Sequence, residues 1–161
     1  MIDTKENILS AKEIHRQFKT ASTVLPVIKG IDLNIEKSET VAVTGASGVG
    51  KSTLLHILGG LDRPTSGEVV LGGVSLSGQS EKSLAMFRNE RIGFVFQFHY
   101  LLEDFNALEN VMIPMLVAGK RKSAASEKGE LLLELVGLSD RMDHRPHQLS
   151  GGEQQRVAVA R

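Results

Sequence analysis

Hydrophobic and polar residues alternate within the first forty positions, and this alternation predicts β-strands. Ile31, Leu33 and Ile35 are separated by polar residues, which is the period of two that is typical of a half-buried strand. The same pattern predicts strands over Ile8–Phe18 and Val27–Glu36. The amino-terminal part of the chain is therefore expected to be β-rich.

Shorter apolar runs follow and predict a strand–loop–helix unit. Thr40–Thr44 is β-branched and apolar, which is typical of a buried parallel strand, and Ile92–Gln97 favours another strand. Ser66–Gly73 predicts a strand that ends in a turn. Helices are expected over Ser52–Leu58 and Ser83–Asn89.

The pattern becomes helical after Gln97. Asn106 and Glu109 have the spacing of a capping box, which opens a helix over Ala107–Val117. Pro114 should kink this helix or end it early, because proline lacks the N–H that the helix needs.

Two more helices are expected further along the chain. Ala124–Val136 predicts a helix that ends at Gly137. Another helix begins within Gly151–Arg161. The apolar face of the first of these helices is predicted to contain Leu131, Leu132, Leu135 and Val136.

Composition and charge narrow the class of protein. The 161 residues suffice for about one domain, and 41% hydrophobic with 24% charged residues is ordinary for a soluble globular protein. Nineteen basic and nineteen acidic residues cancel, which disfavours a nucleic-acid partner. The absence of cysteine excludes disulfides and thiolate metal sites. Apolar runs reach about eight residues, well short of the roughly twenty in a membrane span, so a membrane role would need a partner.

The segment Gly45–Thr53 carries the strongest chemical signal. Its first eight residues match G-x-x-x-x-G-K-[ST], and a chance match is roughly a one-per-cent event or less. Glycines let backbone N–H groups converge on phosphate oxygens, and the following helix directs its free N–H groups to the same place. Lys51 adds a point charge, and the Ser52 hydroxyl suits Mg²⁺. The predicted phosphate-binding residues are Gly45, Ala46, Ser47, Gly48, Val49, Gly50, Lys51, Ser52 and Thr53.

A second glycine-rich element has the sequence LSGGEQQR over Leu149–Arg156. Ser150 and Glu153 have capping-box spacing, so a helix is expected to begin here. Gly151 and Gly152 leave the N–H groups of its first turn accessible, which suits an anion. The alternative is an ordinary capped helix with a flexible first turn.

Together these motifs resemble the ABC-transporter ATPase family, and the resemblance covers essentially the whole chain. The second element is similar to the family signature LSGGQ, in which Glu is a common fifth residue. Gln97 follows an apolar segment, as the Q-loop glutamine of the family does. Phe18 lies where the family places an aromatic residue that stacks on adenine, although Tyr is more usual there and a core residue is the alternative.

The resemblance implies an α/β P-loop ATPase domain over residues 1–161. An antiparallel β part would occupy the amino-terminal side, and a helical insert would occupy about residues 98–148. ATP and Mg²⁺ would be the cofactors. Lys51 and Gln97 would act in catalysis, and Ser52 and Gln97 would contact the metal.

The resemblance also implies partners. Two copies would form a head-to-tail dimer, with Ser150, Gly151, Gly152 and Glu153 of one copy facing ATP on the P-loop of the other. Integral membrane subunits would hold the protein at the cytoplasmic face of the inner membrane. No nucleic acid is expected, since only 52 residues separate Gln97 from Ser150 and the ABC proteins of DNA repair carry a long insert there.

Two segments are similar to the ATPases of lipoprotein-releasing systems within this family. They are Ser52–Asp62 and Gln97–Phe105. The second usually reads QFHHLLPDF, but Tyr100 and Glu103 replace His and Pro in this region, where the family contacts its membrane subunits. Release of lipoproteins is therefore the implied function. Macrolide-export and cell-division ATPases, and a nucleotide-binding module without hydrolysis, remain open.

The hydrolytic machinery of the family includes a strand that ends in Asp-Glu just past the signature helix, and a later histidine. No apolar strand ending in Asp-Glu occurs between the P-loop and Arg161. We therefore expect a fragment that is incomplete at its carboxyl end, with an uncovered sheet edge. Such a chain should be poorly stable and nearly inactive in hydrolysis when alone.

Overall fold

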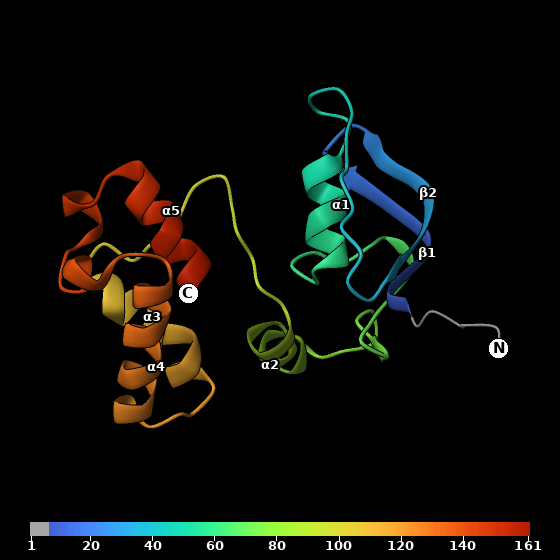
Figure 1. Ribbon diagram of the computed structural model, residues 1–161. Helices are drawn as coiled ribbons and strands as arrows, with labels where there is room; N and C mark the ends of the chain where they lie inside the picture. The colour runs from blue at the N-terminus through green and yellow to red at the C-terminus, as the bar shows by residue number, and fades with distance from the viewer. Residues whose placement is uncertain (1–6) are drawn as a thin grey trace. The chain divides into compact units, whose positions relative to one another are not determined.

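The computed structural model describes residues 7–161 and divides the chain into two compact units (Figure 1). The first unit ends at Arg88, and the second comprises Asn89–Arg161. Among the described residues, each helix is too short or too polar to span a bilayer.

A four-stranded antiparallel sheet forms the framework of the first unit. The strand order is β2-β1-β3-β4, and every neighbouring pair is antiparallel. This confirms the expected antiparallel β part. Ile31, Leu33 and Ile35 are half-buried, with exposed residues between them, as their alternation predicted. The strands are β1 (Asn7–Lys19), β2 (Val24–Glu36), β3 (Ser66–Leu71) and β4 (Val74–Ser75).

Helix α1 (Lys51–Leu58) packs on one side of this sheet, as Figure 1 shows. Helix α2 (Glu81–Arg91) adds Leu84 to the same core. Both helices were predicted from the sequence, with shorter bounds. The buried apolar residues of this core are Leu9, Ala11, Ile14, Ile28, Leu54, Ile57, Leu58, Val69, Leu76 and Leu84.

Two predicted strands are wrong in this structure. Residues 40–45 and 92–96 are extended segments without regular secondary structure, and Val41 and Val95 are 41% and 57% exposed. A strand exists only where a neighbour completes its hydrogen-bond ladder, and within residues 7–161 no segment pairs with either of them. A β-branched apolar run therefore indicates a segment that fits a sheet, but it does not supply the neighbour.

The second unit is helical, as predicted for the chain after Gln97. Its elements are α3 (Ala107–Val117), α4 (Lys122–Leu135), the short 3-10 turns Ser139–Arg141 and Pro146–Gln148, and α5 (Gly151–Ala160). Its buried apolar core contains Ala107, Val111, Leu133, Leu138, Leu149, Val157 and Ala160.

The predicted capping box at the start of α3 is confirmed. The Glu109 N–H donates to Asn106 Oδ1 at 2.8 Å, and the Asn106 N–H donates to Glu109 Oε2 at 2.9 Å. Pro114 does not end the helix early, because α3 continues to Val117. The Ala118 N–H donates to the Pro114 carbonyl at 3.0 Å, so the turn after the proline closes normally.

The predicted apolar face of α4 is wrong in part. Leu131 and Leu135 are 46% and 73% exposed, whereas Ala125, Gly129 and Leu133 are buried at a spacing of four residues. A Cβ on Gly129 would lie 2.8 Å from Leu108 Cδ1, so this glycine allows α3 to approach closely. Gly129 contributes nothing to an apolar pattern, which is why the pattern indicated the wrong face. Leu132 and Val136 pack partly buried against the core, as predicted.

Asn110 is fully buried in α3 and holds the segment that precedes the helix. Its Oδ1 accepts from the Leu102 N–H at 2.8 Å, and its Nδ2 lies 3.0 to 3.1 Å from the carbonyls of Leu102, Phe105 and Asn106. One amide therefore ties the Leu102 N–H and the Phe105 carbonyl to α3, and it adds a second hydrogen bond to the Leu102 and Asn106 carbonyls, which also accept from the Phe105 and Asn110 N–H groups.

We expect Asn110→Leu to lower the free energy of unfolding by about 2 kcal/mol or more, because it removes all the hydrogen bonds that this buried amide makes with the preceding segment. Urea unfolding followed by circular dichroism measures this change. Asn34→Ala, which removes an exposed partner of Ser10, should stay within about 0.5 kcal/mol of the unsubstituted chain. Equal effects of the two substitutions would contradict the role assigned to Asn110.

Candidate functional site

The loop before α1 depends on glycine at three positions. Gly45, Gly48 and Gly50 have φ angles of 147°, 79° and 104°, a region that side-chain-bearing residues rarely adopt. A Cβ on Gly50 would also lie 2.8 Å from Val27 Cγ1 of β2. The loop can therefore turn into α1 beside β2 only with a glycine at position 50.

The amino-terminal end of α1 is open. Gly50 is its N-cap, no side chain caps it, and its first turn has no acidic residue. The first N–H groups of a helix have no partner within the helix and carry partial positive charge. This end of α1 is therefore suited to an anion.

The Lys51 ammonium lies over the same loop. Its Nζ donates to the carbonyl of Gly45 at 2.9 Å and to that of Ala46 at 2.7 Å. Both contacts are to neutral carbonyl oxygens, and no carboxylate of residues 7–161 pairs with this charge. A phosphate oxygen would bind this ammonium more strongly than a carbonyl does.

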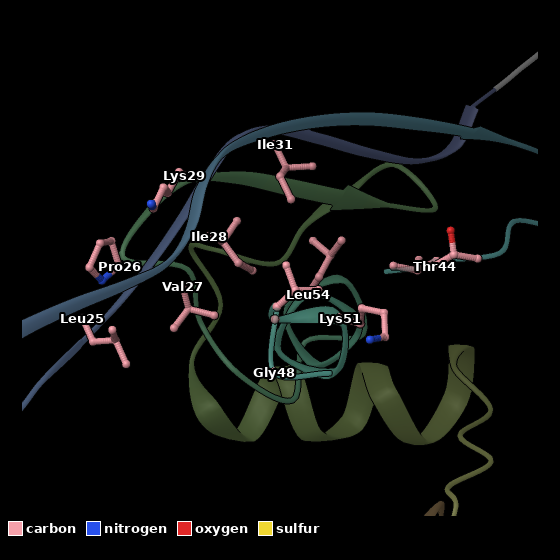
Figure 2. Close-up of a pocket in the computed structure, with 13 residues that line it drawn as sticks. Leu25, Pro26, Val27, Ile28, Lys29, Ile31, Thr44, Gly48, Lys51 and Leu54 are labelled. Atoms are coloured by element: carbon pink, nitrogen blue, oxygen red, sulfur yellow. The ribbon is translucent and has the colours of Figure 1, made fainter. Parts of the chain in front are cut away.

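A pocket of about 620 Å³ lies between β2 and this loop, within the first unit (Figure 2). Figure 2 shows Leu25, Val27 and Ile28 from β2 on one side, and Gly48 and Lys51 on the other. This volume is within the range of small-molecule sites. The lining residues are Leu25, Pro26, Val27, Ile28, Lys29, Ile31, Val43, Thr44, Gly48, Val49, Gly50, Lys51 and Leu54.

The charge of the pocket favours a polyanion. Lys29 and Lys51 line it, and none of its lining residues, all within the described part of the chain, is Asp or Glu. An apolar wall faces a cationic, amide-rich loop. Such a site suits a ligand with a flat apolar part and a phosphate chain.

Four of the predicted phosphate-binding residues, Gly48 to Lys51, line this pocket. The other five belong to the same loop or to the first turn of α1: Gly45, Ala46, Ser47, Ser52 and Thr53.

Within residues 7–161 no group of three His, Cys, Asp or Glu residues could hold a metal ion by itself. A metal at Ser52 would need oxygens of the ligand and water, which is how Mg²⁺ is commonly held beside phosphates.

Phe18 lies at the end of β1, next to the border of the pocket. It pairs with Leu25, which lines the pocket, and its side chain is 39% exposed. Phe18 is in neither buried core. The Arg16 guanidinium lies 4.6 Å from the centroid of its ring. The geometry leaves Phe18 available for stacking, and its contact with adenine stays a prediction.

Gln97 belongs to the second unit and is exposed. Aromatic rings surround this part of the chain: Phe96 lies 5.7 Å from Phe94 and 5.4 Å from Tyr100, measured between ring centroids. Phe98, next to Gln97, is 68% exposed. This segment therefore exposes Phe98 and Tyr100 close to Gln97 in the chain, and the role of Gln97 toward metal and phosphate stays a prediction.

The second glycine-rich element begins α5, as predicted. The Ser150 N–H and hydroxyl donate to Glu153 Oε2 at 2.8 and 2.7 Å, and the Glu153 N–H faces Ser150 Oγ at 3.4 Å. Gly151 and Gly152 are exposed, and among residues 7–161, apart from the flanking residues and the backbone of the helix itself, no atom lies closer than 4.0 Å to a Cβ built on either. The helix end is thus accessible from outside.

Arg141 supports this helix start, and no sequence pattern indicated this contact. Its Nε donates to Glu153 Oε1 at 3.1 Å, from a short turn twelve positions earlier in the chain. These two residues line a polar hollow of about 340 Å³ together with Gly137, Ser139 and Asp140. Only the folded connection between α4 and α5 brings them together.

The pKa of the Glu153 carboxyl is lowered from 4.5 to about 2. The hydrogen bond from the Ser150 N–H is the largest cause, followed by the Ser150 hydroxyl and by Arg141. All three favour the ionised carboxylate.

Ionised Glu153 should stabilise the fold above pH 4.5, and this contribution should disappear as pH falls toward about 2. The folded pKa is below the unfolded one, so the unfolded chain takes up the proton first. The stability difference between the chain and Glu153→Gln should therefore be constant above about pH 5 and shrink in this window. Urea unfolding at several pH values measures it. Glu103→Gln, an exposed substitution outside α5, is the control, and equal curves for both variants would contradict the prediction.

Comparisons with known proteins agree with this geometry. The family model described as ABC transporter matches residues 28–161. The chain is 52% identical over 155 residues to the lipoprotein-releasing system ATP-binding protein LolD of Geobacter metallireducens, covering 96% of this chain and 69% of that protein. It is 56% identical over 135 residues to the protein of the same name from Aquifex aeolicus, covering 84% of this chain and 60% of that one.

Solved structures match the fold. The ATP-binding cassette MJ0796, in a dimeric post-hydrolysis state bound to ADP and Pi, matches with a TM-score of 0.87 and 35% identity. This match covers 94% of this chain and 67% of that one. A second dimeric structure of the same bacterial ABC transporter cassette has a TM-score of 0.86, with the same identity and coverage.

Proposed function

Because the chain belongs to the ABC transporter family, as one of its ATP-binding subunits, we propose that it couples ATP binding and hydrolysis to the release of lipoproteins from the inner membrane. The observation that carries this proposal is the pocket between β2 and the loop before α1, where Lys51 and an open helix end converge. The cargo is inferred from the relatives that are more than 50% identical to this chain.

The phosphates of ATP would bind at the amino-terminal end of α1. Lys51 would exchange its two carbonyl partners, Gly45 and Ala46, for phosphate oxygens, and the loop N–H groups would bind the same oxygens. The Ser52 hydroxyl, and Gln97 by the family resemblance, would hold Mg²⁺. The ion would neutralise charge on the phosphates.

The base would bind near Phe18. Aromatic rings stack on any base, because every base has a flat π-face. The 39% exposure of Phe18 and its pairing with Leu25 of the pocket support this placement.

The accessible start of α5 suits a phosphate held by another molecule. Ser150, Gly151, Gly152 and Glu153 would face ATP bound to a second copy, in a head-to-tail dimer. The open space around both glycines and the likeness to dimeric cassettes support this arrangement. Ser150 would have to turn its hydroxyl from Glu153 toward the phosphate, so the capping box would be partly exchanged on binding.

Integral membrane subunits would be the other partners, at the cytoplasmic face of the inner membrane. The exposed aromatic residues beside Gln97 support a contact there, since exposed apolar groups that lie together mark interaction surfaces. The equal numbers of basic and acidic residues give no support to a nucleic-acid partner.

A second candidate function is nucleotide binding without hydrolysis. It is favoured by the lack of Asp and Glu among the lining residues of the described pocket, because a general base is needed to activate water. The 161-residue chain alone would then bind ATP and release phosphate slowly or not at all.

Lys51→Ala should weaken ATP binding about tenfold to a hundredfold, because it removes a charge-assisted contact to phosphate. Calorimetric titration with Mg²⁺ and ATP measures the affinity, and phosphate release in the same samples separates hydrolysis from binding alone. Lys12→Ala removes an exposed charge outside the pocket and is the control. Unchanged affinity in Lys51→Ala would sink the proposed site.

The chain should bind purified membrane subunits of a lipoprotein-releasing system in preference to those of a macrolide exporter. Phe98→Asp should weaken this binding at least about tenfold, because it places a charge in an apolar contact. Val117→Asp is a matched control, since Val117 is 72% exposed and Phe98 68%. Preference for the macrolide exporter would overturn the assigned cargo, and equal loss in both variants would overturn the assigned surface.

A further inference from the structure

Arg16 connects Phe18 to the turn that follows α1. Its guanidinium carbon lies 4.6 Å from the centroid of the Phe18 ring, and its Nη2 lies 2.8 Å from Asp62 Oδ2. The other carboxylate oxygen, Asp62 Oδ1, accepts from the Arg63 N–H at 2.7 Å. Asp62 is therefore fixed by its own turn before it pairs with Arg16.

The backbone on both sides of Arg16 is fixed to the same connection. The Thr65 N–H donates to the His15 carbonyl at 2.7 Å, and the Gln17 N–H donates to Thr65 Oγ1 at 3.0 Å. Arg16 is thus held at its backbone by Thr65 and at its guanidinium by Asp62. These contacts with Thr65 and Asp62 therefore determine where the guanidinium lies against Phe18.

Burying part of the Arg16 guanidinium beside Phe18 is energetically unfavourable. Its Nε is buried and has no hydrogen-bond partner in the described part of the chain. A methionine of similar length would fill the space without leaving a buried N–H unpaired, but it would remove the ion pair with Asp62. The ion pair with Asp62 and the position over the Phe18 ring both use the planar cation of Arg16, so this side chain links the two residues.

We propose that Arg16 is a positioning residue for the nucleotide base. It supports the Phe18 ring from one face, so that a purine stacks on the other face at the border of the pocket. The inference rests on the proposed function, in which Phe18 stacks on adenine. Asp62 orients the guanidinium, so the three side chains act as one support that begins at the turn after α1.

The test compares ligands that differ only in the base. Affinities of the purified chain for ATP and for inorganic triphosphate, both with Mg²⁺, are measured for Arg16→Met, Asp62→Asn and Phe18→Ala. Arg16→Met should weaken ATP binding about fivefold and leave triphosphate binding unchanged, because the loop at Lys51 is untouched. Asp62→Asn should show the same discrimination with a smaller loss. Lys19→Met removes an exposed charge from the same strand and should alter neither affinity.

The outcomes are distinguishable. Equal weakening of ATP and triphosphate by Arg16→Met, or no weakening of ATP, overturns the role of Arg16. If Phe18→Ala and Lys51→Ala weaken ATP binding and Arg16→Met does not, the proposed function stands and only this inference fails. If Lys51→Ala has no effect, the proposed function fails first. Thermal unfolding of each variant verifies folding, and Arg16→Lys replaces Arg16→Met if the latter does not fold.

Discussion

The fixed backbone of the loop before α1 is the constraint on which the site depends. Gly50 has a positive φ and leaves no room for a Cβ beside Val27, so the turn into α1 needs glycine where it passes β2. That contact places an uncapped helix end and the Lys51 ammonium at one pocket, with apolar residues of β2 as the opposite wall. Sheet packing, helix start and charge are thus coupled through one glycine.

The two glycine-rich elements differ in how they begin their helices. The amino-terminal end of α1 has no side-chain cap, so the N–H groups of its first turn are free for a ligand. The amino-terminal end of α5 is capped by Ser150 and Glu153, and Arg141 donates a hydrogen bond to the Glu153 carboxylate. A phosphate at α1 therefore meets unpaired donors, whereas a phosphate at α5 must compete with Glu153 for the Ser150 hydroxyl. This difference agrees with the proposal that α1 binds the nucleotide within one copy, whereas α5 contacts it only in the proposed dimer.

Local patterns predicted most of the helices and strands and both capping boxes. The capping boxes at Asn106 and Ser150 are confirmed because their interactions lie within four residues. The strands expected over Thr40–Thr44 and Ile92–Gln97 are wrong, because a strand depends on a neighbour that its own residues do not specify. The apolar face of α4 was misassigned because Gly129 packs by having no side chain.

The sequence by itself determined the glycine-rich loop before α1 and its match to a phosphate-binding motif, because the glycines, the lysine and the start of the helix are consecutive residues. It also determined the family resemblance that the comparisons bear out. Only the tertiary structure decided which distant residues support these motifs. Arg16 with Asp62, Arg141 with Glu153, and Asn110 with its loop are joined across turns, and such pairs depend on how the chain folds back on itself.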